Sequence, residues 1–362
     1  MRPPACHVLI ARTGNNRHAV ASRDEIRLFA RCRNERLRLP AFFQHYRAMG
    51  VDRFYIVDNE SSDGTTEYLA SQPDVHLFRT TDRYGESGSG TAWMNALLAE
   101  FGVGCWCVTV DIDELLIFPG SEQTPLRRLT AHLDGRGHDA FVCLMLDLYP
   151  AGPIVDSPYT AGGDLLAAAP YFDAGPYGRA PLTECPGFLI MGGVRERVFH
   201  PEYRRRGLWA KAYHALFNRV LLRTPVVRDN AWIRRRRLPS PPALSKVPLV
   251  RWDAASRYFR SVHAISPKTV APETGVLLHF KLLHDLHAKA RDESTRGEYS
   301  RGALEYRRYA RTLDRNPRTT FMYEGSVRFE STSQLVRLGL MQDSEAWTAA
   351  REQAQREIGT TP

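Results

Sequence analysis

Hydrophobic and polar residues alternate in blocks along the first third of the chain, and these blocks predict strands and helices in turn. Buried strands are expected at residues 26–32, 53–58 and 75–78 and in the run CWCVTVDID. Helical apolar spacing fills the gaps between them, in LPAFFQHYRAMG and at about residues 91–101. Because strands that alternate with short helices indicate βαβ crossovers, the pattern predicts an α/β domain with a mostly parallel sheet and helices on both faces.

The periodicity is weaker in the rest of the chain, but further elements are still expected. DAFVCLMLDLY, LSKVPLVRW and GVLLHFK favour strands, and GFLIMGGVRERVF favours a strand pair around Gly192-Gly193. SRGALEYRRYARTL and SEAWTAAREQAQREI have the spacing of peripheral amphipathic helices. The expected organisation is an N-terminal extension (1–24), a main domain (25–290) with an appended smaller mixed sheet, and a C-terminal helical extension (291–362).

The composition is that of an ordinary globular protein. Of 362 residues, 43% are hydrophobic and 25% are charged. No run approaches the about 18 apolar residues that would indicate a membrane span, and the N-terminus lacks the arrangement of a secretory signal. Six cysteines without CxxC or zinc spacing are most simply small buried hydrophobes in a reducing compartment. We therefore expect a cytoplasmic protein.

The positive charge is confined to one segment. Between Arg195 and Arg237 the chain carries thirteen Lys or Arg residues against three acids, which accounts for the net charge of +9. A basic insertion at about residues 203–238 would suit an anionic membrane surface, and so a peripheral position at the inner face of a membrane. It would equally suit an acidic acceptor or form a solvated excursion of the domain. Because no recognised binding module accompanies the charge, we expect no nucleic-acid partner.

Polar residues follow three of the predicted strands at their carboxyl ends. They are Arg33-Asn34-Glu35, the turn from Asp58 to Asp63, and the acidic group DIDE at residues 111–114. In a parallel sheet these ends share one edge, where ligands bind. In an extended chain Asp111 and Asp113 point the same way, which suits Mg²⁺ or Mn²⁺ with positions left for water and phosphate. The alternative is a strand end capped by solvated acids.

These motifs together resemble the nucleotide-sugar-dependent glycosyltransferases of family 2 and their relatives. The match runs through CRNER, VDNESSDGT, YGESGSGTAWMNALL and VDIDELL over about residues 25–118, and more loosely to about residue 290. The resemblance implies a GT-A fold, a Rossmann-like α/β domain. It implies an inverting transferase that moves a sugar from a nucleoside diphosphate, uridine by default, to a hydroxyl of a glycan or lipid-linked acceptor. It also implies Mn²⁺ or Mg²⁺ as cofactor, because a dication stabilises the departing diphosphate.

The resemblance also assigns roles to residues. The metal would be held by Asp111 and Asp113, and by a late histidine, for which His279 is favoured over His263. The side chains expected at the nucleotide sugar are Arg33, Asn34, Glu35, Asp58, Asn59, Arg83 and Asp111. Ser61 and Asp63 would instead shape the nucleoside turn. Asn59 replaces a commoner aspartate and Arg33 a commoner aromatic residue, so the base is not fixed by these residues.

The catalytic base is expected downstream of the metal motif, on the acceptor side. An inverting enzyme needs a carboxylate that takes the proton of the attacking hydroxyl. Glu196 and Glu184 are the candidates, with Asp173 as a third. The alternative for Glu196 is an ion pair with its neighbours Arg195 and Arg197.

Two other functions fit parts of the sequence. A haloacid-dehalogenase-type phosphohydrolase also carries Asp-x-Asp at a strand end, but on its first strand and with Thr or Val after it, whereas Leu115 follows the acids here. A non-catalytic protein could dock to anionic surfaces through the basic segment alone.

Overall fold

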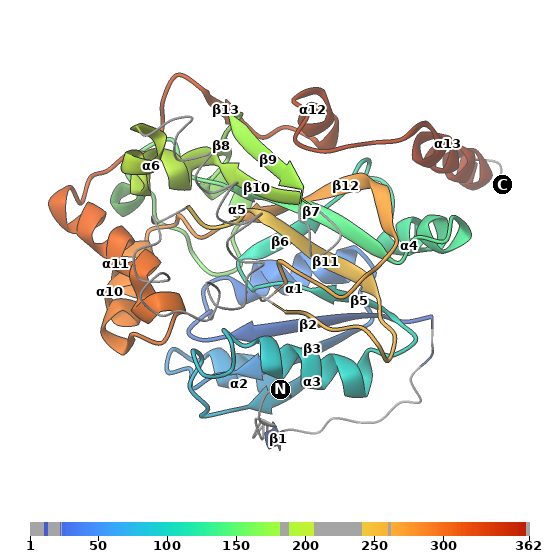
Figure 1. Ribbon diagram of the computed structural model, residues 1–362, viewed down its shortest axis with the longest axis horizontal. Coiled ribbons are helices and arrows are strands. Elements are labelled where there is room, and N and C mark those ends of the chain that lie inside the picture. Colours follow the sequence, from blue (N-terminus) through green and yellow to red (C-terminus); the bar gives the residue numbers. More distant parts are fainter. Residues whose placement is uncertain are drawn as a thin grey trace, which may run out of the picture.

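The chain folds around one mixed sheet of nine strands. The computed structural model describes residues 11–13, 22, 24–181, 188–205, 241–259 and 262–359. The strand order is β1-β4-β3-β2-β5-β11-β7-β12-β6 (Figure 1). In chain order the strands are β1 Ala11–Thr13, β2 Ile26–Cys32, β3 Arg53–Asp58, β4 Val75–Arg79, β5 Trp106–Thr109, β6 Glu114–Ile117, β7 Ala140–Asp147, β11 Ser245–Arg251 and β12 Val270–His279.

Most of these strands run in one direction. β4, β3, β2 and β5 pair in parallel, and β7 and β12 run parallel to each other in the same sense. β11 is antiparallel to both of its neighbours, and the outer strands β1 and β6 are antiparallel to theirs. The predicted α/β class and the parallel run of four strands are confirmed, with the same bounds as predicted for β2 and β3.

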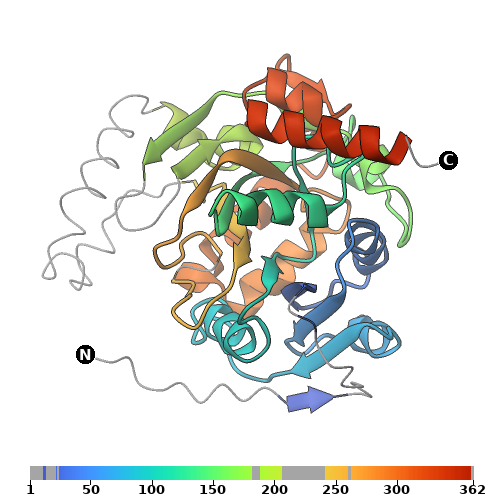
Figure 2. The same ribbon diagram turned by 90° about the vertical axis from the view of Figure 1, so that its right-hand side faces the viewer.

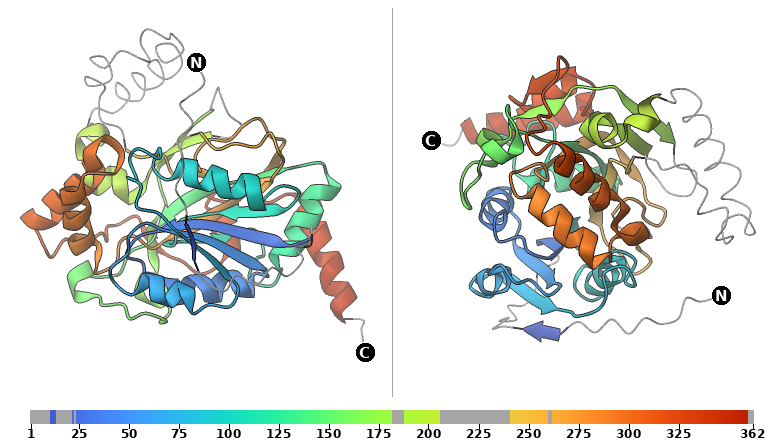
Figure 3. Two further views of the ribbon diagram at one scale, coloured as in Figure 1. Left: turned by 90° about the horizontal axis from the view of Figure 1, so that it is seen from below. Right: turned by 90° about the vertical axis from the view of Figure 1, so that its left-hand side faces the viewer.

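Helices cover both faces of the parallel half, which explains why its strands are apolar on both sides. α1 (Leu39–Ala48) and α2 (Thr65–Ala70) lie on one face and α3 (Thr91–Phe101) on the other (Figure 3, left). Alternate residues of β2 divide between two hydrophobic cores: Leu28 packs in the core that contains α1, and Phe29 in the core that contains α3. This alternation fixes the register of the strand.

The remaining elements lie around the sheet. The other helices are α4 Leu126–Gly135, α5 Leu165–Ala168, α6 Pro201–Arg205, α10 Leu286–Arg296, α11 Ser300–Arg315, α12 Thr332–Arg337 and α13 Glu345–Gly359, with a 3₁₀ turn at Ile154–Asp156. Two small two-stranded sheets pair β9 (Tyr177–Pro181) with β10 (Phe188–Gly192), and β8 (Tyr171–Asp173) with β13 (Ser326–Arg328). α10 and α11 pack side by side at one end of the molecule (Figure 1; Figure 3, right).

The C-terminal helices are anchored to the main body rather than separate from it. Trp347 of α13 is buried and packs against Phe118 and against the ring of His132 on α4. Figure 2 shows α13 lying beside α4. The domain boundary expected at residue 290 falls inside α10.

One predicted element is wrong. GFLIMGGVRERVF does not fold into a strand pair, because β10 pairs with β9 and the chain leaves the strand at Gly192, which has a φ of 137°. Residues Arg195–Phe199 then form a π-helical turn. This turn directs Arg195 inward, where it pairs with Asp147.

Some expectations concern residues that the structure does not describe. Glu184 and nearly all of the basic insertion, from residue 206 to residue 238, lie outside the described residues. Within the described residues, every helix is too short or too polar to cross a bilayer.

Candidate metal and nucleotide site

The acidic group DIDE lies in a turn, not in an extended strand as predicted. β5 ends at Thr109, the N–H of Glu114 donates to the carbonyl of Asp111 (3.1 Å), and β6 begins at Glu114. Asp111 and Asp113 therefore do not point the same way. Asp113 faces β12, whereas Asp111 faces Arg31 and Lys246.

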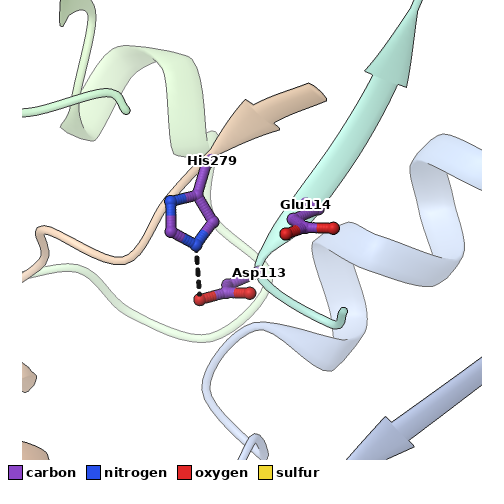
Figure 4. A group of neighbouring side chains, drawn as sticks. All are labelled: Asp113, Glu114 and His279. Carbon is purple, nitrogen blue, oxygen red and sulfur yellow. Dashed lines mark ion pairs between the residues drawn. The ribbon is translucent and has the colours of Figure 1, made fainter. Parts of the chain in front are cut away.

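Asp113, Glu114 and His279 form a compact group of possible metal ligands. One ligand atom from each lies within 4.8 Å of the others, and all three side chains are buried. Nε2 of His279 lies 3.1 Å from Oδ2 of Asp113 (Figure 4). The group is assembled by the sheet, because His279 at the end of β12 pairs with Glu114 at the start of β6 and the N–H of Phe280 donates to the carbonyl of Asp113 (2.8 Å).

A second carboxylate orients His279 from behind. Nδ1 of His279 lies 2.5 Å from Oδ1 of Asp147, its register partner on β7. Nη2 of Arg195 donates to the same oxygen (2.8 Å). Burial alone would lower the pKa of His279, but the nearby carboxylates Asp113 and Asp147 raise it above its ordinary value. A carboxylate behind a histidine is the arrangement that fixes metal-binding imidazoles.

Asp111 and Glu114 share one buried cation. Nζ of Lys246 donates to Oδ2 of Asp111 (2.7 Å) and to Oε1 of Glu114, and its side chain is 3% exposed. Nη2 of Arg31 lies 3.0 Å from the other oxygen of Asp111. Although burial would raise the pKa of Asp111, Arg31 and Lys246 hold it well below its usual range. Burial raises the pKa of Glu114 in spite of Lys246.

The donor set fits a hard or borderline dication. Two carboxylates and one imidazole nitrogen suit Mn²⁺, which accepts both oxygen and nitrogen, better than Mg²⁺, which binds mainly through oxygen and water. Asp113 and His279 are common to this group and to the predicted ligand set. The structure places Glu114, rather than Asp111, beside them.

The predicted nucleoside turn is stabilised by its own side chains. Asp58 Oδ1 accepts from the N–H of Ser61 (3.2 Å) and Asn34 Oδ1 from the N–H of Ser62 (2.8 Å). Asp63 Oδ1 accepts from the N–H of Thr65 at the start of α2 (3.0 Å). These contacts agree with the shaping role expected for Ser61 and Asp63, and the N-cap of α2 is Gly64.

Three of the predicted nucleotide-binding side chains contact α10. The pairs are Arg33 with Asp292 (2.7 Å) and Glu293 (3.1 Å), Glu35 with Lys289, and Asn59 with Arg296 (2.7 Å). α10 therefore covers the ends of β2 and β3 in this structure. Asn34 and Asp58 make their contacts within the turn described above.

The remaining candidates lie outside the three-residue group. The side chain of Arg83 is 73% exposed and lies 3.8 Å from Glu86. His263 donates from Nδ1 to the carbonyl of Ser245 (2.6 Å) and lies outside the three-residue group. Asp173 is buried, with both oxygens bound by Arg197 and one by Tyr149 as well, so it is a structural ion pair rather than a free base.

Glu196 lies on the π-helical turn, next to a residue of the site. Its neighbours Arg195 and Arg197 direct their guanidinium groups to Asp147 and Asp173. The side chain of Glu196 is half-buried. π-Helical turns are frequent at functional sites, and this one joins Glu196 directly to the residue that supports His279.

Sequence reasoning missed the buried charges that complete the site. They are Arg31 in LFARC, Asp147 in LMLDLY and Lys246 in LSKVPLVRW. Each interrupts a run of buried residues in its strand, and a charge in such a position needs a partner because burying it unpaired is costly. That interruption is the signal that could have found them.

Comparison with known proteins returned no relatives: no protein-family description matches the chain, and no curated protein matches it.

Proposed function

We propose that this protein is a metal-dependent inverting glycosyltransferase with a GT-A fold. It would transfer a sugar from a nucleoside diphosphate, uridine by default, to a hydroxyl of a glycan or lipid-linked acceptor. The observation that carries the proposal is the Asp113–Glu114–His279 group at the carboxyl-terminal edge of a largely parallel sheet. This is the edge at which nucleotides bind in open α/β sheets.

The acidic group and the polar end of β2 are joined by a short path of contacts. Asp113 is linked through the backbone of Phe280 to Arg38, whose Nε donates to the Phe280 carbonyl (3.0 Å). Nη1 of Arg38 in turn lies 3.4 Å from Oε2 of Glu35, at the end of β2. A diphosphate between the two polar regions could therefore meet the metal group while its nucleoside meets the turn.

In the transfer step, the chain's own residues would hold and polarise the reactants. A dication held by Asp113 and His279, with Glu114 beside them, would act as a Lewis acid toward the leaving diphosphate. Arg31 offers a second positive charge to the phosphate oxygens. Asp147 would keep the imidazole of His279 oriented while its Nε2 is deprotonated.

The displacement needs one general base. The oxygen of the acceptor hydroxyl forms a bond to the anomeric carbon while the bond from that carbon to the phosphate oxygen breaks, and the bonding electrons leave with the diphosphate. The hydroxyl proton passes to a carboxylate. Glu196 is the favoured base among the described residues because its turn adjoins the site. Glu184 remains a candidate outside them.

The basic insertion is the region that we propose to bind the acceptor. A segment with this charge at about residues 203–238 would attract a phosphorylated lipid acceptor at an anionic membrane or an acidic glycan. We place the protein in the cytoplasm, with contact at the inner membrane face as the version that suits a lipid-linked acceptor.

A screen of nucleotide sugars for Mn²⁺-dependent hydrolysis of the donor tests the proposal. We expect hydrolysis by the wild type, loss of at least about a hundredfold in Asp113→Asn, and little change in Asp74→Asn, whose carboxylate pairs with Arg47 at the opposite edge of the sheet. Hydrolysis of an aryl phosphate but of no nucleotide sugar would favour the phosphohydrolase instead. Binding to anionic vesicles with neither activity would favour the non-catalytic docking protein.

A further inference from the structure

The buried lysine of the site has no place in the function proposed so far. Lys246 is on β11, the strand between β5 and β7, and is 2% exposed. It is followed by an irregularity in the pairing of β11 with β7, between Lys246 and Leu249. Pro248 lies in that irregularity, and proline cannot donate to the ladder. Bulges of this kind re-aim side chains next to active sites.

The side chain of Lys246 points toward the acidic turn. Its ammonium group joins Asp111 and Glu114, so it lies beside the oxygens of the candidate metal group. Both carboxylate oxygens of Glu114 already accept a hydrogen bond: Oε2 accepts from the N–H of Asp111 (3.2 Å), and Oε1 accepts from Lys246. A dication that used Glu114 would have to compete with this ammonium.

The permanent charges of the site nearly balance without any ion. Four carboxylates, those of Asp111, Asp113, Glu114 and Asp147, lie with three permanent cations, Arg31, Lys246 and Arg195. A dication added alone leaves an excess of positive charge in a buried place, which is costly. An anion with several charges, such as a diphosphate, would remove that excess.

We propose that Lys246 is the site's own counter-cation, which neutralises Asp111 and Glu114 while no dication is present and turns to the diphosphate when a dication binds. Dication and diphosphate then bind as a linked pair, each raising the affinity for the other. The inference rests on the proposed function. It names Lys246 as a diphosphate-binding residue beyond the ligands given above.

Two affinities that change in opposite directions test this role. In Lys246→Met, Mn²⁺ alone should bind at least about tenfold more tightly, because a competing positive charge is gone. Pyrophosphate, measured at a fixed saturating concentration of free Mn²⁺, should bind at least about tenfold more weakly, because a charge-assisted hydrogen bond is lost. Both are measured by calorimetry, and pyrophosphate makes the result independent of the nucleobase.

The matched control is Lys268→Met. Lys268 is also a buried lysine, 2% exposed in its side chain, and pairs with Asp253 (2.6 Å) and Asp139 (3.6 Å) away from the site. We expect it to lose stability and to keep both affinities. If Lys246→Met instead lowers the affinities for Mn²⁺ and pyrophosphate together, or changes neither affinity, Lys246 only forms a structural ion pair and the proposal is wrong.

Wild-type protein provides a test that does not depend on folding of the variant. Saturating pyrophosphate should raise the affinity for Mn²⁺ at least about tenfold. Binding of both ligands with no linkage overturns the role of Lys246 but leaves the glycosyltransferase possible. Binding of neither ligand overturns the proposed function as well.

Discussion

Removing the charge of Asp147 should weaken metal binding although Asp147 is not itself a proposed ligand. Asp147 accepts from Nδ1 of His279 at 2.5 Å and from Arg195 at 2.8 Å, and all three side chains are at most 5% exposed. In Asp147→Asn the side chain keeps its shape. It loses the charge that orients the imidazole, and it leaves Arg195 buried with one anionic partner fewer.

The magnitude follows from these contacts. Loss of a carboxylate behind a metal-binding histidine typically costs about 10- to 100-fold in metal affinity. Leaving one member of a buried ion pair unpaired costs about 3–5 kcal/mol of stability, less here because Nη1 of Arg195 also lies 3.6 Å from Glu305. Calorimetric titration with Mn²⁺ gives the first quantity, and urea unfolding gives the second.

Asp173→Asn is the matched control. Asp173 is likewise a buried carboxylate, bound by Arg197 and Tyr149, but it lies in the small β8–β13 sheet. We expect the two variants to lose similar stability and only Asp147→Asn to lose affinity for Mn²⁺. Equal Mn²⁺ binding by both variants would refute the orienting role, since the loss would then not depend on contact with His279.

Two further predictions concern His45, which contacts β6, and Gly90, which lies against Arg31. His45 donates from Nε2 to the carbonyl of Leu116 (2.8 Å), and burial lowers its pKa from 6.5 to about 4. The unfolded chain therefore takes up the proton first, so the free energy of unfolding should fall by up to about 3 kcal/mol as the pH drops from 6.5 to about 4. Comparison with His45→Gln isolates this pH dependence. Equal pH dependence of unfolding in the two proteins would contradict the prediction. Gly90 has a φ of +73°, and a Cβ there would lie 2.3 Å from Cδ of Arg31, so Gly90→Ala should displace Arg31 and weaken diphosphate binding. Gly50→Ala is the control: at a φ of +89° with nothing within 4 Å of an added Cβ, it should show the backbone strain alone, about 1 kcal/mol in thermal unfolding. The same diphosphate affinity in both variants would mean that Arg31 does not contact the ligand.

The elements that depend on local pattern could be predicted from the sequence. β2 and β3 have the predicted bounds, and α3 spans the predicted residues 91–101, because the apolar spacing of each is set by neighbours within a few positions. The placement of His279 beside Asp113 also agrees with a histidine that follows a buried strand.

The details of the site depend on pairings between distant segments. The chain turns at Asp111–Glu114 because β6 pairs back onto β12, more than 150 residues later, and no local signal marks that pairing. Lys246 meets Asp111 for the same reason, through the insertion of β11 between β5 and β7. A sequence pattern can show that a buried charge needs a partner, but the order of strands in the sheet decides which partner it has.

In the proposed enzyme, Asp113 and His279 hold a dication against a diphosphate. A crystal structure of the protein with Mn²⁺ and uridine diphosphate, with the metal located by anomalous scattering, tests it most directly. We predict one Mn²⁺ ion bonded to the Asp113 carboxylate, to Nε2 of His279 and to phosphate oxygens. Diphosphate bound elsewhere, or an unbroken hydrogen bond between Asp113 and His279 with manganese at another place, would contradict the account.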